Sequence, residues 1–189
     1  MADSNNDLSN ALSLYERNIK VSEAFYTPLQ CLEVCLRNSL HRCMSNAYVE
    51  DWFHDNRVPL SNESMTLIAQ AETALVHEPL PLRPGSIVAE LKFGFWVGLL
   101  GPRYDSTIWR NHLYKAFLAR GGKKRGDVHS RLNALRRFRN RVAHHEPIYH
   151  RPLAALHQET IEAISWMCKD TSRWAEHHSR VPAVLGNIR

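Results

Sequence analysis

Residues 139–145, RNRVAHH, combine an arginine with two histidines: four residues separate Arg139 from His144, and His145 comes directly after His144. Histidine has an unperturbed pKa near ~6.5, so it can accept or donate a proton at neutral pH. Arginine carries a permanent charge on a planar group whose N–H donors match a phosphate. Together these residue types are suited to cleaving RNA without a metal ion: the substrate's 2′-hydroxyl attacks, histidine transfers the proton and arginine stabilises the phosphorane.

A helix must position this motif. Apolar residues recur at helical spacing before and within it, and they predict one buried stripe: Val128, Leu132, Leu135, Phe138 and Val142. Arg139 falls near the middle of that stripe, so it needs either a carboxylate partner or an anion from outside. On a continuous helix His144 would lie about 140° around from Arg139. Because Pro147 disfavours helical geometry in the residue before it, we expect the helix to loosen, so that His144 or His145 turns toward the arginine.

A polar ridge earlier in the chain has two interpretations. Glu33, Arg37 and His41 are spaced four residues apart beside an apolar helical stripe. The first interpretation is a pair of intrahelical contacts, each worth roughly 0.2–0.5 kcal/mol. The second is a supporting role, in which Glu33 or Arg37 reaches the motif and orients Arg139 or a histidine.

The charge distribution is uneven. The chain has a net charge of +5, but residues 110–151 contain twelve Lys and Arg against Asp127 and Glu146, a local net of +10. Such a segment favours a polyanionic partner, and nucleic acid is the commonest one in a cytosol. The alternative is a solvated basic helix with no partner. We expect phosphate contacts from a basic loop and from the motif helix, namely Lys123, Lys124, Arg125, Arg136, Arg137 and Arg141.

Length and composition exclude several classes of protein. With 189 residues, 44% of them hydrophobic, the chain suits a single globular domain and not a disordered tail or a disulfide scaffold. Residues 1–7 lack the features of an export signal, and the most apolar stretch, 87–100, is shorter than a membrane span and contains charged residues. We therefore expect a cytoplasmic protein. We expect neither a metal site nor a cofactor, because the histidines have no cysteine or carboxylate at ligand spacing.

The fold class follows from helical spacing throughout, with no sustained alternation typical of strands. We predict an all-α bundle of six to eight helices with flexible ends at 1–7 and 177–189. The expected helices start near Leu8, at Thr27–Pro28 (to about Tyr48), at Ser61 or Asn62, at Ser86 (to Leu100), at Ser106 or Thr107, at Asp127 and, for the last, at Pro152. Residues 77–85 contain three prolines and should form a loop.

The block LRRFRNRVAHHEPI, residues 135–148, resembles the Rx4-6H signature of HEPN ribonucleases as it occurs in the Abi-like (abortive infection D/F) proteins of bacteria. Residues 15–41 and 85–100 resemble that family's other blocks in the same order, so the resemblance covers about 12–175. It implies a HEPN-like helical bundle with additional helices, anti-phage defence and metal-independent endoribonuclease activity. It also implies that Arg139 and His144 are the catalytic pair, with Asn140 as the polar residue after the arginine and His145 as a second candidate histidine.

Three functions are compatible with these features. The first is a metal-independent endoribonuclease of abortive infection. The second is a non-catalytic RNA-binding module that holds a structured small RNA, and the third is a helical bundle that only binds a partner protein. For the enzyme we expect a homodimer, because acid and base roles need two histidines and because the apolar segment 87–100 needs a partner surface. We expect His144 rather than His145 to act, because it lies closer to the helical turn that holds Arg139.

Overall fold

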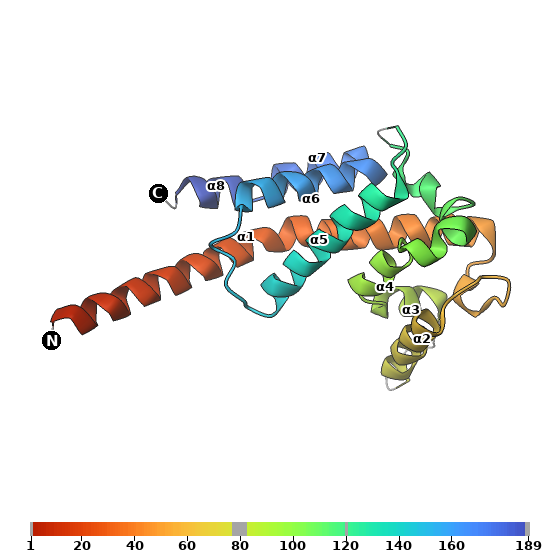
Figure 1. The fold of residues 1–189 in the computed structure, drawn as a ribbon, viewed down its shortest axis with the longest axis horizontal. Helices are drawn as coiled ribbons and strands as arrows, with labels where there is room; N and C mark the ends of the chain where they lie inside the picture. Colours follow the sequence, from red (N-terminus) through yellow and green to blue (C-terminus); the bar gives the residue numbers. More distant parts are fainter. Residues whose placement is uncertain (1, 77–82, 120, 188–189) are drawn as a thin grey trace.

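The structure is a computed structural model that describes residues 2–76, 83–119 and 121–187 (Figure 1). All regular elements in these ranges are helical, which confirms the predicted all-α class. A long first helix, α1 (Ala2–Ala47), runs through the molecule, and its N-terminal part projects beyond the other helices (Figure 1). No helix in the described ranges combines the length and apolar character needed to cross a bilayer.

Helix α1 corrects the expected break at Pro28. The two helices predicted on either side of Thr27 are one continuous helix, with Pro28 inside it. A proline in a helix interior removes one backbone hydrogen bond. Phe25, Leu29 and Leu32 are buried on both sides of the proline, so one apolar face continues past it. Tertiary packing of that face outweighs the local penalty.

Helix α2 (Asn62–Leu75) starts where the sequence predicted. Ser61 is its N-cap, and its Oγ accepts a hydrogen bond from the backbone N–H of Ser64 at 3.2 Å. The Tyr104 hydroxyl contacts Ser64 Oγ at 2.8 Å, which ties this end of α2 to the core. Of the predicted loop 77–85, residues 77–82 lie outside the described residues, and Pro84 already belongs to the next helix.

The single helix predicted from Ser86 to Leu100 is wrong. Two short helices occupy this region, α3 (Pro84–Glu90) and α4 (Phe93–Gly98), and the backbone between them is extended. Trp96 explains the break, because its Nε1–H donates to the Leu91 carbonyl at 3.1 Å, where the chain leaves α3. The large apolar side chains of both helices are buried within this one chain, so they do not need the partner surface that we expected.

Residues 102–117 are also less regular than predicted. In place of one α-helix from Ser106 or Thr107 there are a 3₁₀ turn η2 (Pro102–Tyr104), a π-helical turn η3 (Asp105–Trp109) and a 3₁₀ segment η4 (Leu113–Phe117). On a straight α-helix Ile108 and Leu113 would lie about 140° apart. Both are fully buried here, so the irregular backbone turns both side chains into the core.

Four helices complete the chain: α5 (Arg125–Ala143), α6 (Leu153–Met167), α7 (Lys169–His178) and α8 (Val181–Gly186). Helix α5 begins two residues before the predicted cap, so Asp127 lies in its first turn. Pro152 precedes α6 as predicted, but α6 is not the last helix. Within the C-terminal segment 177–189, α8 packs on α1 and α6, and its Val181 is fully buried.

Helices α5, α6 and α7 lie along α1, and α2, α3 and α4 gather near its C-terminal half (Figure 1). The larger part of the core fills the space among these elements, and a smaller apolar cluster joins Phe25 of α1 to Phe138 and Val142 of α5. That smaller cluster fixes the end of α5 against α1. The packing of this helix end places the Arg139 motif next to α1.

Candidate functional site

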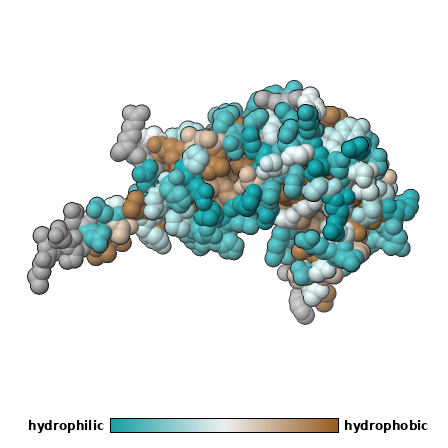
Figure 2. All heavy atoms as spheres, viewed as in Figure 1, coloured by the Kyte–Doolittle hydropathy of each residue, from teal (hydrophilic) through white to brown (hydrophobic). Residues whose placement is uncertain are grey.

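A groove of about 830 Å³ runs between α5 on one side and α2 with the α3–α4 junction on the other. Figure 2 shows the surface hollowed in this region. Helix α5 contributes residues that recur at helical spacing along one face, together with the motif: His129, Asn133, Arg136, Arg139, Asn140 and His144. The structure therefore brings three of the four predicted catalytic residues, Arg139, Asn140 and His144, to one groove. His145 does not line it.

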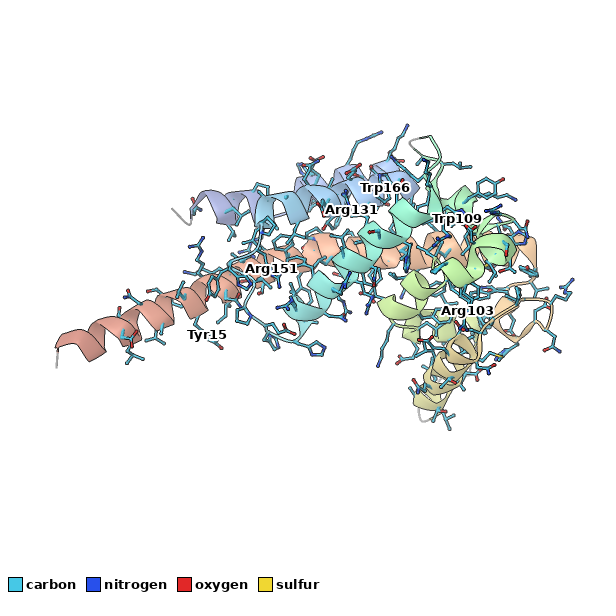
Figure 3. All side chains as sticks on the ribbon, in the orientation of Figure 1. Tyr15, Arg103, Trp109, Arg131, Arg151 and Trp166 are labelled. Atoms are coloured by element: carbon cyan, nitrogen blue, oxygen red, sulfur yellow. The ribbon has the colours of Figure 1, made fainter. Side chains whose placement is uncertain are left out.

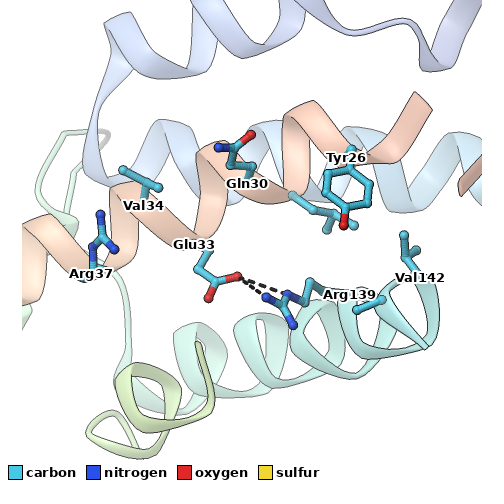
Figure 4. Close-up of a pocket in the computed structure, with 9 residues that line it drawn as sticks. Tyr26, Gln30, Glu33, Val34, Arg37, Arg139 and Val142 are labelled. Atoms are coloured by element: carbon cyan, nitrogen blue, oxygen red, sulfur yellow. Dashed lines mark hydrogen bonds and ion pairs between the residues drawn. The ribbon is translucent and has the colours of Figure 1, made fainter. Parts of the chain in front are cut away.

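Arg139 is paired with a carboxylate. Its Nε and Nη2 both lie 3.0 Å from Oε2 of Glu33 on α1 (Figure 4). The Arg139 side chain is 38% exposed and that of Glu33 22%, so the pair is at the surface and not in the core. Because a guanidinium has five N–H donors, several remain for a phosphate in the groove. Glu33 thus has the supporting position of the second interpretation.

The rest of the polar ridge is used elsewhere. Arg37 donates to the Ala89 carbonyl at 3.5 Å and to Asn38 at 3.3 Å, and it makes no hydrogen bond to Arg139 or the motif histidines. His41 accepts a hydrogen bond from Nε1–H of Trp52 at 3.0 Å. Burial lowers the pKa of His41, which favours the neutral imidazole that can accept this bond. Of the two expected supporting residues, only Glu33 reaches Arg139.

The two histidines have different backbone roles. Helix α5 ends at Ala143 with His144 as its C-cap, and His145 follows with a left-handed φ of 57°. The N–H of His145 donates to the Val142 carbonyl at 3.2 Å, and that of Glu146 donates to the Arg141 carbonyl at 2.9 Å. These two bonds define a Schellman motif, in which the left-handed position is usually glycine. Both histidines are exposed, but His144 lines the groove and His145 does not.

Asn18 on α1 holds the chain directly after this turn. Its side-chain oxygen accepts from the Ile148 N–H at 2.7 Å, and its amide nitrogen donates to the Glu146 carbonyl at 3.4 Å. Asn18 is itself buried. The position of His144 therefore depends on a residue about 130 positions earlier. Sequence reasoning missed this residue, and its only signal was a polar side chain on the apolar side of α1.

The predicted basic loop is mostly engaged in structural contacts. Arg125 begins α5, and its guanidinium donates to Asp105 Oδ1 and to the Leu100 carbonyl, both at 3.0 Å. Lys123 Nζ lies 5.3 Å from the centre of the Trp166 ring, which Arg131 also approaches (Figure 3). Of the three loop cations, only Lys124 is exposed, and the other two are half-buried.

Ion pairs reduce the free charge of the basic segment. Five of its twelve cations pair with carboxylates in the described part of the chain: Arg110, Arg125, Arg131, Arg139 and Arg141. Of the other residues predicted to bind RNA, Arg137 is exposed on α5 and Arg136 lines the groove, where it donates to Asn133 Oδ1 at 3.0 and 3.1 Å. The groove is therefore not uniformly basic.

The groove also contains residues that sequence reasoning did not select. Lys92 adds a cation, while Glu63 and Glu90 add negative charge. His129 lies on the same face of α5, and burial, with Arg125 and Arg136 adding to it, lowers the pKa of its imidazole. His129, Asn133, Arg136 and Asn140 follow one another at steps of four, three and four residues. This polar helical periodicity, opposite the apolar stripe, is the signal that could have identified them.

Within the described residues, no three His, Cys, Asp or Glu side chains cluster in a way that could hold a metal ion. No family model, no curated protein and no solved structure matches this chain.

Proposed function

We propose that the protein is a metal-independent endoribonuclease that acts in the cytoplasm as part of anti-phage defence. The observation that supports this function most directly is that Arg139, Asn140 and His144 line one open groove. The groove contains the exposed imidazole of His144 and the guanidinium of Arg139, which the Glu33 carboxylate orients. These are the two groups that metal-free cleavage of RNA requires.

In this reaction the 2′-oxygen attacks the adjacent phosphorus while the bond from phosphorus to the 5′-oxygen breaks. His144 accepts the proton of the 2′-hydroxyl, and a second acid donates a proton to the departing 5′-oxygen. Arg139 neutralises the charge that develops on the phosphorane. The products are a 2′,3′-cyclic phosphate and a free 5′-hydroxyl.

The second acid is not His129 of the same chain. His129 and His144 are fifteen residues apart along α5 and its cap, which corresponds to about 22 Å at 1.5 Å per residue. Two groups so far apart cannot serve one phosphate. We propose a homodimer in which the partner subunit supplies the second proton-transfer group. Co-expressing two differently tagged subunits, one wild type and one Arg139→Ala, and measuring the activity of the mixed dimer tests this arrangement.

Cleavage of a labelled RNA by the purified protein in excess EDTA tests the enzyme. The proposal predicts cleavage in the chelator and fragments that end in a 2′,3′-cyclic phosphate. Arg136→Gln in the groove should weaken RNA binding and cleavage. Arg173→Gln is the matched control, because Arg173 is an exposed cation on α7 away from the groove. Fragments with 5′-phosphates, or a chelator that stops cleavage, would contradict the mechanism.

The alternative function is a non-catalytic RNA-binding module that holds a structured small RNA. The cations of α5 support it, because the exposed Arg137 and the groove residue Arg136 can contact phosphates without any proton transfer. Stable retention of intact RNA during purification, with no cleavage of any RNA offered, would support this alternative over the enzyme.

The defence role requires a separate test in cells. Bacteria that express the wild-type protein should release fewer phage than bacteria that express the Arg139→Ala variant at the same level. Equal phage yields from the two strains would argue against a defence role that depends on the groove.

A further inference from the structure

A second cavity adjoins Arg139 (Figure 4). Its volume is about 260 Å³, and it lies between α1 and the last turn of α5. Three of its α1 residues, Tyr26, Gln30 and Glu33, are separated by four and three residues and so share one helix face. Arg139 and Val142 form the opposite wall. Arg139 therefore borders both cavities and connects them.

Two side chains of this cavity have polar atoms that make no hydrogen bond within the described residues. Both contacts from Arg139 go to Oε2 of Glu33, and Oε1 accepts no hydrogen bond from any described residue. The Gln30 amide is exposed and also makes no hydrogen bond within the described ranges. Tyr26 is 64% exposed, which is high for an aromatic residue that borders a cavity. Figure 4 shows its ring and the Glu33–Arg139 pair directed into the space between α1 and α5.

We propose that this cavity binds a guanine base of the RNA, next to the phosphate at Arg139. The inference rests on the proposed function, because it assigns a base pocket to the same site. A flat ring stacks on Tyr26, and its edge faces Glu33 and Gln30. Stacking on an aromatic side chain is the common way in which proteins hold an unpaired base.

The available donors and acceptors select guanine. Its Watson–Crick edge presents an N1–H donor, which Oε1 of Glu33 accepts, beside the O6 acceptor, to which the Gln30 amide donates. Adenine would place the N1 lone pair against the carboxylate. Cytosine presents a lone pair at N3 in the same way. Uracil has a ring N–H, but a carbonyl oxygen on each side of it would face the carboxylate, and its single ring fills less of the cavity.

Binding of mononucleotides measures the preference without any cleavage. The probes are the 3′-monophosphates of guanosine, adenosine, cytidine and uridine, with affinities measured by calorimetry on the full-length protein. The proposal predicts the tightest binding for guanosine 3′-monophosphate. Equal affinity for all four nucleotides would overturn it.

Two substitutions locate the binding site. Tyr26→Ala should weaken guanosine 3′-monophosphate binding by roughly 5- to 150-fold, the range expected for one base–aromatic stack. Tyr15→Ala is the matched control, because Tyr15 is 65% exposed on the same helix but far from the cavity, and it should bind like the wild type. Glu33→Gln should remove the preference for guanosine over adenosine. Wild-type affinity in Tyr26→Ala would refute the proposed pocket, and circular dichroism verifies that each variant is folded.

The two proposals fail in distinguishable ways. In the first case the protein cuts RNA without a preference for guanine at the fragment ends, and Tyr26→Ala cuts as the wild type does. This result would refute the pocket and leave the ribonuclease intact. Selective binding of guanosine 3′-monophosphate by a protein that cuts no RNA would refute the ribonuclease and leave the pocket intact.

Discussion

His145 is predicted to lower the stability of the protein, because it occupies a left-handed backbone position. Its φ is 57°, and its N–H and that of Glu146 close the Schellman turn at the end of α5. This conformation costs a residue with a Cβ about 1–2 kcal/mol. Glycine avoids that cost, but the greater conformational freedom of its unfolded chain lowers the free energy of unfolding by about 0.4–1 kcal/mol. His145→Gly should therefore stabilise the protein by about 0.5–1 kcal/mol. For a chain of this length the shift in Tm is about 1–4 °C.

Thermal unfolding followed by circular dichroism measures this shift. Ala134→Gly is the matched control, because Ala134 is exposed in the interior of the same helix, where glycine should destabilise by about 1 kcal/mol. Substitution by glycine thus changes the Tm in opposite directions within α5 and in the turn that follows it. RNA cleavage by His145→Gly should match the wild type, since His145 does not line the groove. A lower Tm for His145→Gly than for the wild type would refute the assigned turn.

Three further predictions follow from charged and titratable groups. Burial lowers the pKa of His157, so its contribution to stability is complete above about pH 6.5 and is lost as the pH falls through its folded pKa. His157→Met should therefore flatten the fall in Tm between pH 7.5 and 5.5. Profiles of Tm against pH that coincide for the variant and the wild type would contradict this. Arg125→Met should lower the free energy of unfolding by about 2 kcal/mol in urea titrations, because it breaks the contacts with Asp105 and the Leu100 carbonyl; an unchanged midpoint would show that these contacts contribute nothing. RNA binding should weaken steeply between roughly 50 and 200 mM salt. The double variant Lys123→Ala with Lys124→Ala should weaken binding equally for all RNA sequences. An affinity independent of salt would exclude phosphate contacts.

Local signals in the sequence predicted the helical class and several helix starts. Ser61 caps α2 as expected, because an N-cap acts through backbone groups only three residues away. The apolar stripe of α5 is buried for the same reason, since its spacing depends on helix geometry alone. The helix breaks were predicted less well. Pro28 lies inside α1, and the contact of Trp96 with Leu91 divides the segment that looked like one apolar helix.

The sequence predicted the motif on α5, but not which residues of the other helices meet it. The spacing of Arg139 and His144 identified the motif, and the ridge on α1 left Glu33 as one of two possible supporting residues. The choice between Glu33 and Arg37 depends on how α1 packs on α5, a contact between residues 106 positions apart. The groove has the same origin, because its opposite wall comes from α2 and the α3–α4 junction. No pattern within α5 contains that information.

The most direct test of the proposed function compares the two adjacent histidines. His144→Ala and His145→Ala remove the same side chain at neighbouring positions, but only His144 lines the groove with Arg139. The rate of RNA cleavage in EDTA should fall by ~10² to 10⁴ in His144→Ala, as is typical when a general acid or base is lost, and should stay near the wild-type rate in His145→Ala. RNA binding and the helical circular dichroism signal should persist in both. Full cleavage by His144→Ala would contradict the role proposed for this groove.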